Sequence, residues 1–214
     1  MSKIHSIPQE NIQLQIDSIV REVLDGNYNK VSIGQLNISE DLKNDSTLIS
    51  CDMTFGAKNY SLKGTGRGLV DALFGALLTS LKKDYVSLEN ITLQDFVVTV
   101  DMNKFYRKKS KTDASVEAAV FVSNKTGKIF LFRHTCKSMI SASVLCVSKM
   151  VEYYVNSERA VVHLKACIKD SQERARPDLT ERYVSLLSEL VRNVSYEKTI
   201  TNLERSEVNE EGTK

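Results

Sequence analysis

The sequence predicts an α+β protein: a tandem β-β-β-α repeat with two sheets backed by helices, plus N- and C-terminal helices. Three observations predict this fold class. Short segments alternate apolar and polar residues, as half-buried strands do. Longer segments place apolar residues at helical spacing along one face. The order of these segments in the first half of the chain recurs about 70 residues later, which indicates an internal repeat.

The first predicted helix covers residues 8–25, where Pro8 suits the first helical position and isoleucine and valine residues share one face. Three predicted strands follow, at residues 31–38, 48–55 and 58–63. A turn at Gly56–Ala57 joins the last two strands. A helix over residues 69–83, with leucines along one side, completes a first β-β-β-α unit at residues 28–84.

The second unit is predicted at residues 85–157. It consists of a long extended stretch at 85–101, a hairpin formed by 114–122 and 128–134, and a helix from about 138 to 155. An offset of about 70 aligns Val70 with Ile140 and Leu77 with Val147. The hydrophobic pattern, the turn positions and the order of the elements therefore agree between the two halves.

The segments outside the repeat are predicted to be helical or unstructured. Residues 1–27 contain the N-terminal helix, and residues 158–201 form a C-terminal helical extension in which Pro177 opens the last helix. Residues 202–214 are charged and have no apolar stripe, so we expect a disordered tail.

Composition narrows the function classes. Hydrophobic residues at 42% and charged residues at 26% are typical of a globular protein, and a net charge of +2 does not favour nucleic acid as a partner. Lysines and aromatic residues between Lys104 and Lys111 allow stacking on a nucleic-acid strand, but a solvated loop is the favoured interpretation. No apolar run reaches the roughly 18 residues of a membrane span, and no signal peptide is recognisable.

The cysteines and histidines show no metal-binding or catalytic spacing. The cysteines form no C-x-x-C pair, so we expect reduced, buried or half-buried thiols in a cytoplasmic protein. The histidines are far apart and form no recognisable set with a nucleophile. We therefore expect no cofactor, no metal and no enzymatic activity. The cysteines are Cys51, Cys136, Cys146 and Cys167, and the histidines are His5, His134 and His163.

Three glycines lead into the helix of the first unit: Gly64, Gly66 and Gly68. In one interpretation, their backbone N–H groups and the start of the helix bind a carboxylate or a phosphate, with Arg67 adding charge. In the other, they form a strand-to-helix turn in which glycine permits positive φ and lets another group approach the main chain closely, and Asp71 interacts with the helix dipole. A P-loop is excluded, because no Gly-Lys-Ser/Thr follows.

The second helix start offers hydroxyl groups from Ser138, Ser141 and Ser143. Each hydroxyl either caps free N–H groups of the helix or contacts a ligand, and capping is the commoner function. His134 lies just before this helix and either faces water or contacts an anion.

These motifs resemble the C-terminal regulatory (dimerisation) domain of 2-isopropylmalate synthase and its citramalate synthase relatives. Residues 64–72 are similar to the family pattern Gly-x-Gly-Pro-(Val/Ile)-Asp-Ala, and Asp113–Ala114 match a short Asp-Ala strand start. Ile140, Ala142 and Ser143 fit the family's Asp-Ile-x-x-Ala-Ser helix start, with Ser138 at the aspartate position. The resemblance covers about residues 28–157.

The resemblance implies a homodimer whose helix starts lie near a site for a feedback inhibitor such as leucine or isoleucine. The chain is too short to add the family's catalytic (β/α)₈ barrel, so a non-catalytic regulatory protein acting with a partner enzyme is expected. The alternative is a structural protein–protein interaction module that has lost the ligand site. The resemblance assigns ligand binding to Gly64, Gly66, Gly68, Asp71, Asp113, Ala114, Ser138, Ile140 and Ser141.

Overall fold

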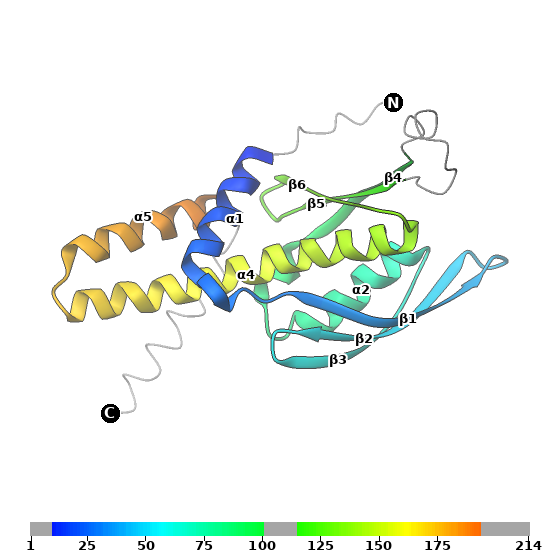
Figure 1. Ribbon diagram of the computed structural model, residues 1–214, viewed down its shortest axis with the longest axis horizontal. Helices are drawn as coiled ribbons and strands as arrows, with labels where there is room; N and C mark the ends of the chain where they lie inside the picture. The colour runs from blue at the N-terminus through cyan, green and yellow to red at the C-terminus, as the bar shows by residue number, and fades with distance from the viewer. Residues whose placement is uncertain (1–9, 101–114, 194–214) are drawn as a thin grey trace.

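The computed structural model describes residues 10–100 and 115–193, drawn as ribbons in Figure 1. The first unit consists of β1 (Val31–Asp41), β2 (Ser46–Phe55), β3 (Lys58–Gly66) and α2 (Leu69–Leu81), and short turns join its three strands. The second unit consists of β4 (Thr92–Val100), β5 (Val116–Ser123), β6 (Ile129–Cys136) and α4 (Met139–Glu173). The flanking helices are α1 (Glu10–Leu24) and α5 (Pro177–Asn193).

Each unit forms its own antiparallel three-stranded sheet, in the orders β1-β2-β3 and β4-β5-β6. The predicted α+β repeat is therefore confirmed. Even a bulge is repeated, between Ile33 and Leu36 in β1 and between Leu93 and Asp95 in β4. The offset of 70 holds for β2 and β5, for β3 and β6, and for the helix starts. It fails for β1 and β4, because the connection from β4 to β5 is longer than the turn from β1 to β2.

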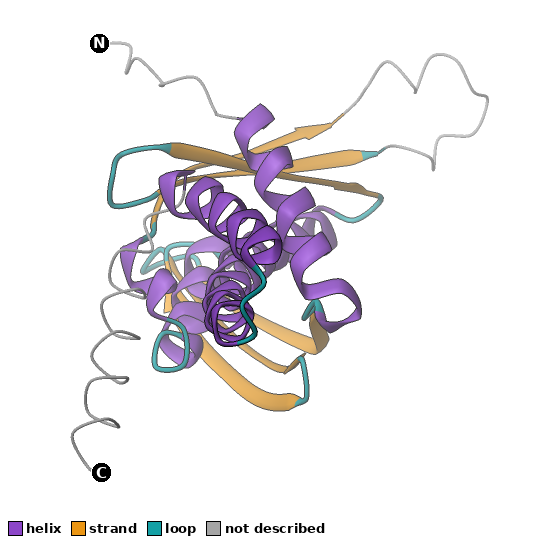
Figure 2. Cartoon of the chain, turned by 90° about the vertical axis from the view of Figure 1, so that its left-hand side faces the viewer, coloured by secondary structure: helices purple, strands orange, loops and turns teal. Residues whose placement is uncertain are grey.

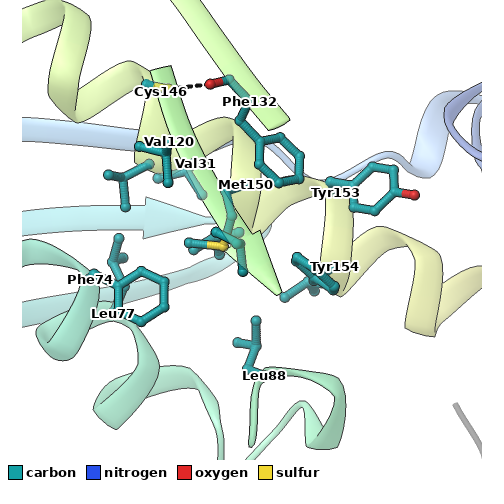
Figure 3. Close-up of a cluster of buried hydrophobic side chains, with 14 of the residues drawn as sticks. Val31, Phe74, Leu77, Leu88, Val120, Phe132, Cys146, Met150, Tyr153 and Tyr154 are labelled. Atoms are coloured by element: carbon teal, nitrogen blue, oxygen red, sulfur yellow. Dashed lines mark hydrogen bonds between the residues drawn. The ribbon is translucent and has the colours of Figure 1, made fainter. Parts of the chain in front are cut away.

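The helices fill the space between the two sheets, which lie on opposite sides of the molecule in Figure 2. Helix α2 packs on β2 and β3, α4 packs on β5 and β6, and the two helices contact each other. The core between them contains fully buried side chains, including Leu77 of α2, Val120 of β5 and Met150 of α4 (Figure 3). Helix α1 crosses α4 and contacts β6 and α5.

For the glycines that precede α2, the structure confirms the predicted close approach of another group and contradicts the predicted positive φ. Gly64 and Gly66 lie in strand β3, and the positive-φ glycines of the described chain are Gly56 and Gly127, both in hairpin turns. A Cβ atom on Gly64 would lie 2.4 Å from the Ala72 carbonyl oxygen, and one on Gly66 would lie 2.5 Å from the Ala72 nitrogen. The expectation of positive φ in a turn was wrong: these glycines let α2 lie directly against β3.

Two predicted elements have different limits. The stretch at 85–101 is not extended throughout, because Val86–Asn90 form a 3₁₀ helix before β4. The Glu158 carboxylate accepts hydrogen bonds from the N–H groups of Val86 and Ser87, at 3.2 and 2.8 Å, and so stabilises this turn from 70 residues away in the sequence.

The helix predicted to end near residue 155 continues to Glu173, which makes α4 a single helix of 35 residues. Its apolar stripe continues through the buried residues Ala160, Val161 and Leu164, and no glycine or proline interrupts it. Ala175, at φ 53°, ends the turn before Pro177 opens α5 as predicted.

Candidate functional site

The starts of α2 and α4 line one groove of about 880 Å³, the helix-start groove. The turn before α2 and the first residues of α2 contribute Arg67 to Asp71, and α4 contributes Met139, Ile140 and Ser143. Strand β4 forms another wall with Leu93 to Phe96 and Val98, and Glu40 of β1 completes the lining. The repeat therefore brings together two helix starts that are 70 residues apart in the sequence.

The start of α2 carries no side-chain cap. Its N-cap residue is Gly68, whose carbonyl accepts the N–H of Ala72 at 3.0 Å. The Asp71 carboxylate accepts the backbone N–H of Arg67 at 3.0 Å, so it is directed toward the turn that precedes the helix. The first N–H groups of α2 form the positive end of the helix dipole, where an anion is stabilised.

The start of α4 is capped by its own side chain. The Ser138 hydroxyl accepts the N–H of Ser141 at 3.3 Å, which confirms capping as a function of Ser138. The Ser143 hydroxyl donates to the Met139 carbonyl at 2.8 Å. The two helix starts of the repeat therefore differ: no side chain caps α2, whereas the Ser138 hydroxyl caps one N–H group of α4.

The groove combines an apolar surface with an acidic excess. Met139 and Ile140 expose 57% and 44% of their surface, which is high for large apolar side chains and leaves them available to a ligand. Among the residues that the structure describes, three carboxylates and one cation line the groove. The carboxylates belong to Glu40, Asp71 and Asp95, and the cation is Arg67. This arrangement suits a ligand that has an apolar part, an anionic group for the helix start and a cationic group for the carboxylates.

The structure places the predicted site residues in three groups. Gly68, Asp71 and Ile140 line the groove. Ser138 and Ser141 lie at the α4 start beside it, whereas Gly64 and Gly66 pack against α2. Asp113 and Ala114 lie outside the described residues, as does the basic run at 104–111. The wall from β4 was missed, because the alternation of a strand does not show which helix its side chains will meet.

Among the other titratable groups of the described chain, the Sγ atom of Cys167 lies 3.5 Å from the Nε2 atom of His163, one turn earlier on α4. Burial, together with the nearby Lys149, lowers the pKa of His134. In residues 10–100 and 115–193, no group of three His, Cys, Asp or Glu side chains is placed to hold a metal ion. The cysteines are free, with Cys51 and Cys146 buried and the other two half-buried, as predicted. None of the described helices is both long and apolar enough to cross a membrane.

A comparison with protein families matches residues 11–155 to the LeuA allosteric (dimerisation) domain. The match begins in α1, includes both sheets and both groove-lining helix starts, and ends within α4, so that the second half of α4 and all of α5 lie beyond it. The matched family is a regulatory domain, and no catalytic domain is matched. A search of curated proteins finds no match. Since the matched residues make up about two thirds of the chain, the protein belongs to the LeuA allosteric (dimerisation) domain family.

Proposed function

We propose that this chain is a non-catalytic cytoplasmic regulatory protein that forms a homodimer and binds a free amino acid in the helix-start groove. One observation carries the proposal: both helix starts of the repeat line a single groove, and the α2 start is uncapped. A partner enzyme would supply the activity that ligand binding regulates. Gly68, Asp71 and Ile140 are the predicted site residues that line this groove.

The lining favours an amino acid over a 2-oxo acid. The ligand carboxylate fits the N–H groups of α2 beside Arg67. The ammonium group fits the acidic side of the groove, and a 2-oxo acid has no such group. The aliphatic side chain fits the apolar surface of Met139 and Ile140.

The second candidate is an interaction module that dimerises and binds no small ligand. The capped start of α4 favours this candidate, because Ser138 already occupies an N–H group that a ligand would need. In β6, His134 and Cys136 also stand at the positions that the offset of 70 relates to Gly64 and Gly66 of β3. Only one of the two helix starts is therefore open to an anion.

Thermal unfolding against a panel of amino acids and 2-oxo acids, together with sedimentation velocity, separates the two candidates. A ligand at 100 times its Kd should add about 2.7 kcal/mol of stability. Ile140→Lys should abolish that gain, while Leu145→Lys should keep it, because Leu145 is similarly exposed on α4 but lies outside the groove. A dimer that no compound stabilises would support the interaction module. A monomer would contradict both candidate functions.

A further inference from the structure

A second pocket, of about 420 Å³, lies between α1, β6 and the middle of α4. It shares no residue with the helix-start groove. Its volume is in the range of small-molecule sites. Leu131 and Phe132 of β6 and Leu14 of α1 give it apolar walls, and charged side chains from all three elements surround them.

The charges around this pocket balance in number. Within residues 10–100 and 115–193, three acidic and three basic side chains line it: Glu10, Asp17, Glu152, Arg21, Arg133 and Lys149. Two ion pairs account for four of them, since Arg21 lies 2.7 Å from Asp17 and Arg133 lies 3.5 Å from Glu10. The two charges that remain are those of Lys149 and Glu152.

Among the described residues, the side chains of Lys149 and Glu152 form hydrogen bonds to backbone groups and not to other side chains. The Lys149 ammonium donates to the Arg133 carbonyl at 3.2 Å, and the Glu152 carboxylate accepts the Val31 N–H at 2.7 Å. Among the residues that the structure describes, neither has an ion-pair partner. They lie three residues apart on α4, so their side chains leave the same face of the helix one turn apart.

Tyr153 lines the pocket, and its hydroxyl is buried without a hydrogen-bond partner among the described residues. The residue as a whole is 5% exposed. Figure 3 shows this hydroxyl directed away from the packed side chains of Val120 and Met150. A buried hydroxyl without a partner is costly, so a polar ligand group at this wall would remove an existing penalty.

We infer that this pocket binds a second small zwitterion, an α-amino acid with an uncharged side chain. Its ammonium group pairs with Glu152, its carboxylate pairs with Lys149 and the Tyr153 hydroxyl, and its side chain packs on Leu131 and Phe132. A phosphate would meet three carboxylates, and an organic dication would meet three cations. A zwitterion leaves the net charge of the pocket unchanged.

The test uses the full chain with labelled leucine and isoleucine methyl groups, titrated with L-valine, L-leucine and L-methionine. Each amino acid is paired with its deaminated acid and its decarboxylated amine. We expect saturable shifts of the Leu14 and Leu131 methyl signals with an amino acid, and binding at least about tenfold weaker for the matched acid and amine. Shifts confined to Ile140 would place the ligand in the helix-start groove alone and overturn the inference.

Three variants make the assignment specific. Lys149→Gln should weaken binding by about tenfold or more, and Lys169→Gln, an exposed lysine on the same helix, should not. Tyr153→Phe should weaken binding without lowering the unfolding temperature, because the lost hydroxyl has no hydrogen-bond partner in the described part of the free protein. Unchanged affinity in Lys149→Gln, or no methyl shift with any of the amino acids, would refute the proposed site.

Discussion

Asn156 of α4 forms two hydrogen bonds with the backbone of Asn29. Its side-chain oxygen accepts the Asn29 N–H at 2.9 Å, and its side-chain nitrogen donates to the Asn29 carbonyl at 2.8 Å. Asn156 is fully buried, and Arg159 adds a bond to the Asn27 carbonyl at 2.7 Å. The long helix of the second unit therefore fixes the segment through which the chain enters the first sheet.

Replacing this amide should destabilise the protein. Asn156→Ala leaves a backbone N–H and a backbone carbonyl of Asn29 without their partner, so we expect a loss of about 2 to 4 kcal/mol in the free energy of unfolding. Urea denaturation measures it. Gln172→Ala, an exposed amide on the same helix, is the control and should change stability by less than about 0.5 kcal/mol. Equal effects in the two variants would mean that the Asn29 bonds contribute nothing to stability.

A methyl group on Gly64 should push α2 away from β3. Gly64→Ala places its Cβ 2.4 Å from the Ala72 carbonyl oxygen, and backbone atoms cannot move aside cheaply. We expect a loss of about 1 to 3 kcal/mol on denaturation. Gly68→Ala is the matched control, because its backbone is extended and its Cβ would meet nothing within 4 Å. A stable Gly64→Ala variant would show that this contact is not tight in solution.

The stability of the protein should depend on pH through Glu152. Burial raises the pKa of this carboxyl above its ordinary value of 4.5, so the folded state holds a proton more tightly than the unfolded state does. Stability is therefore highest below the ordinary pKa and falls as pH rises through the raised pKa. Glu152→Gln keeps an acceptor for the Val31 N–H but removes this titration.

The measurement is the difference in unfolding free energy between Glu152→Gln and the parent protein from about pH 4 to pH 7. The difference should move in favour of the variant as pH rises. Glu173→Gln, an exposed carboxylate at the end of α4, should show no such trend. A difference that stays constant with pH would contradict the burial of this carboxylate.

Helix α5 lies outside the family match, yet its apolar face should contribute to the stability of the whole protein. Leu190 is fully buried, so Leu190→Ala should cost about 2 to 5 kcal/mol. Val184→Ala is the control, since Val184 is 48% exposed on the same helix. A single cooperative transition at a lower urea concentration is the expected result. A separate early transition that leaves the main one unchanged would show that α5 folds independently of the core.

Much of the fold could be predicted because it depends on local pattern. Alternation identified the strands, the helical stripe identified α2 and α5, and the offset of 70 identified the repeat. The 3₁₀ helix at Val86–Asn90 was missed, since the Glu158 carboxylate that stabilises it comes from a distant helix. The close approach that Gly64 permits was predicted, but its partner Ala72 was not, because that contact depends on how α2 packs back on β3.

The candidate site could be predicted only in part, for a similar reason. The motifs indicated both helix starts, and the structure brings them together in one groove. The wall from β4, and the pocket beneath α1, depend on how elements pack across the molecule. Lys149 and Glu152 stand in an ordinary stretch of helix, and only the tertiary arrangement shows that both line a pocket.

Because α4 is one uninterrupted helix, a change in its tilt at one end displaces its other end. The helix begins at the groove, and its 35 residues extend about 50 Å to the hairpin that it forms with α5. A tilt of about 5° at the groove end would displace the far end by about 4 Å over that length. The second half of α4 and helix α5, which lie beyond the family match, would thus move with the start of the second repeat. One continuous helix would transmit this movement.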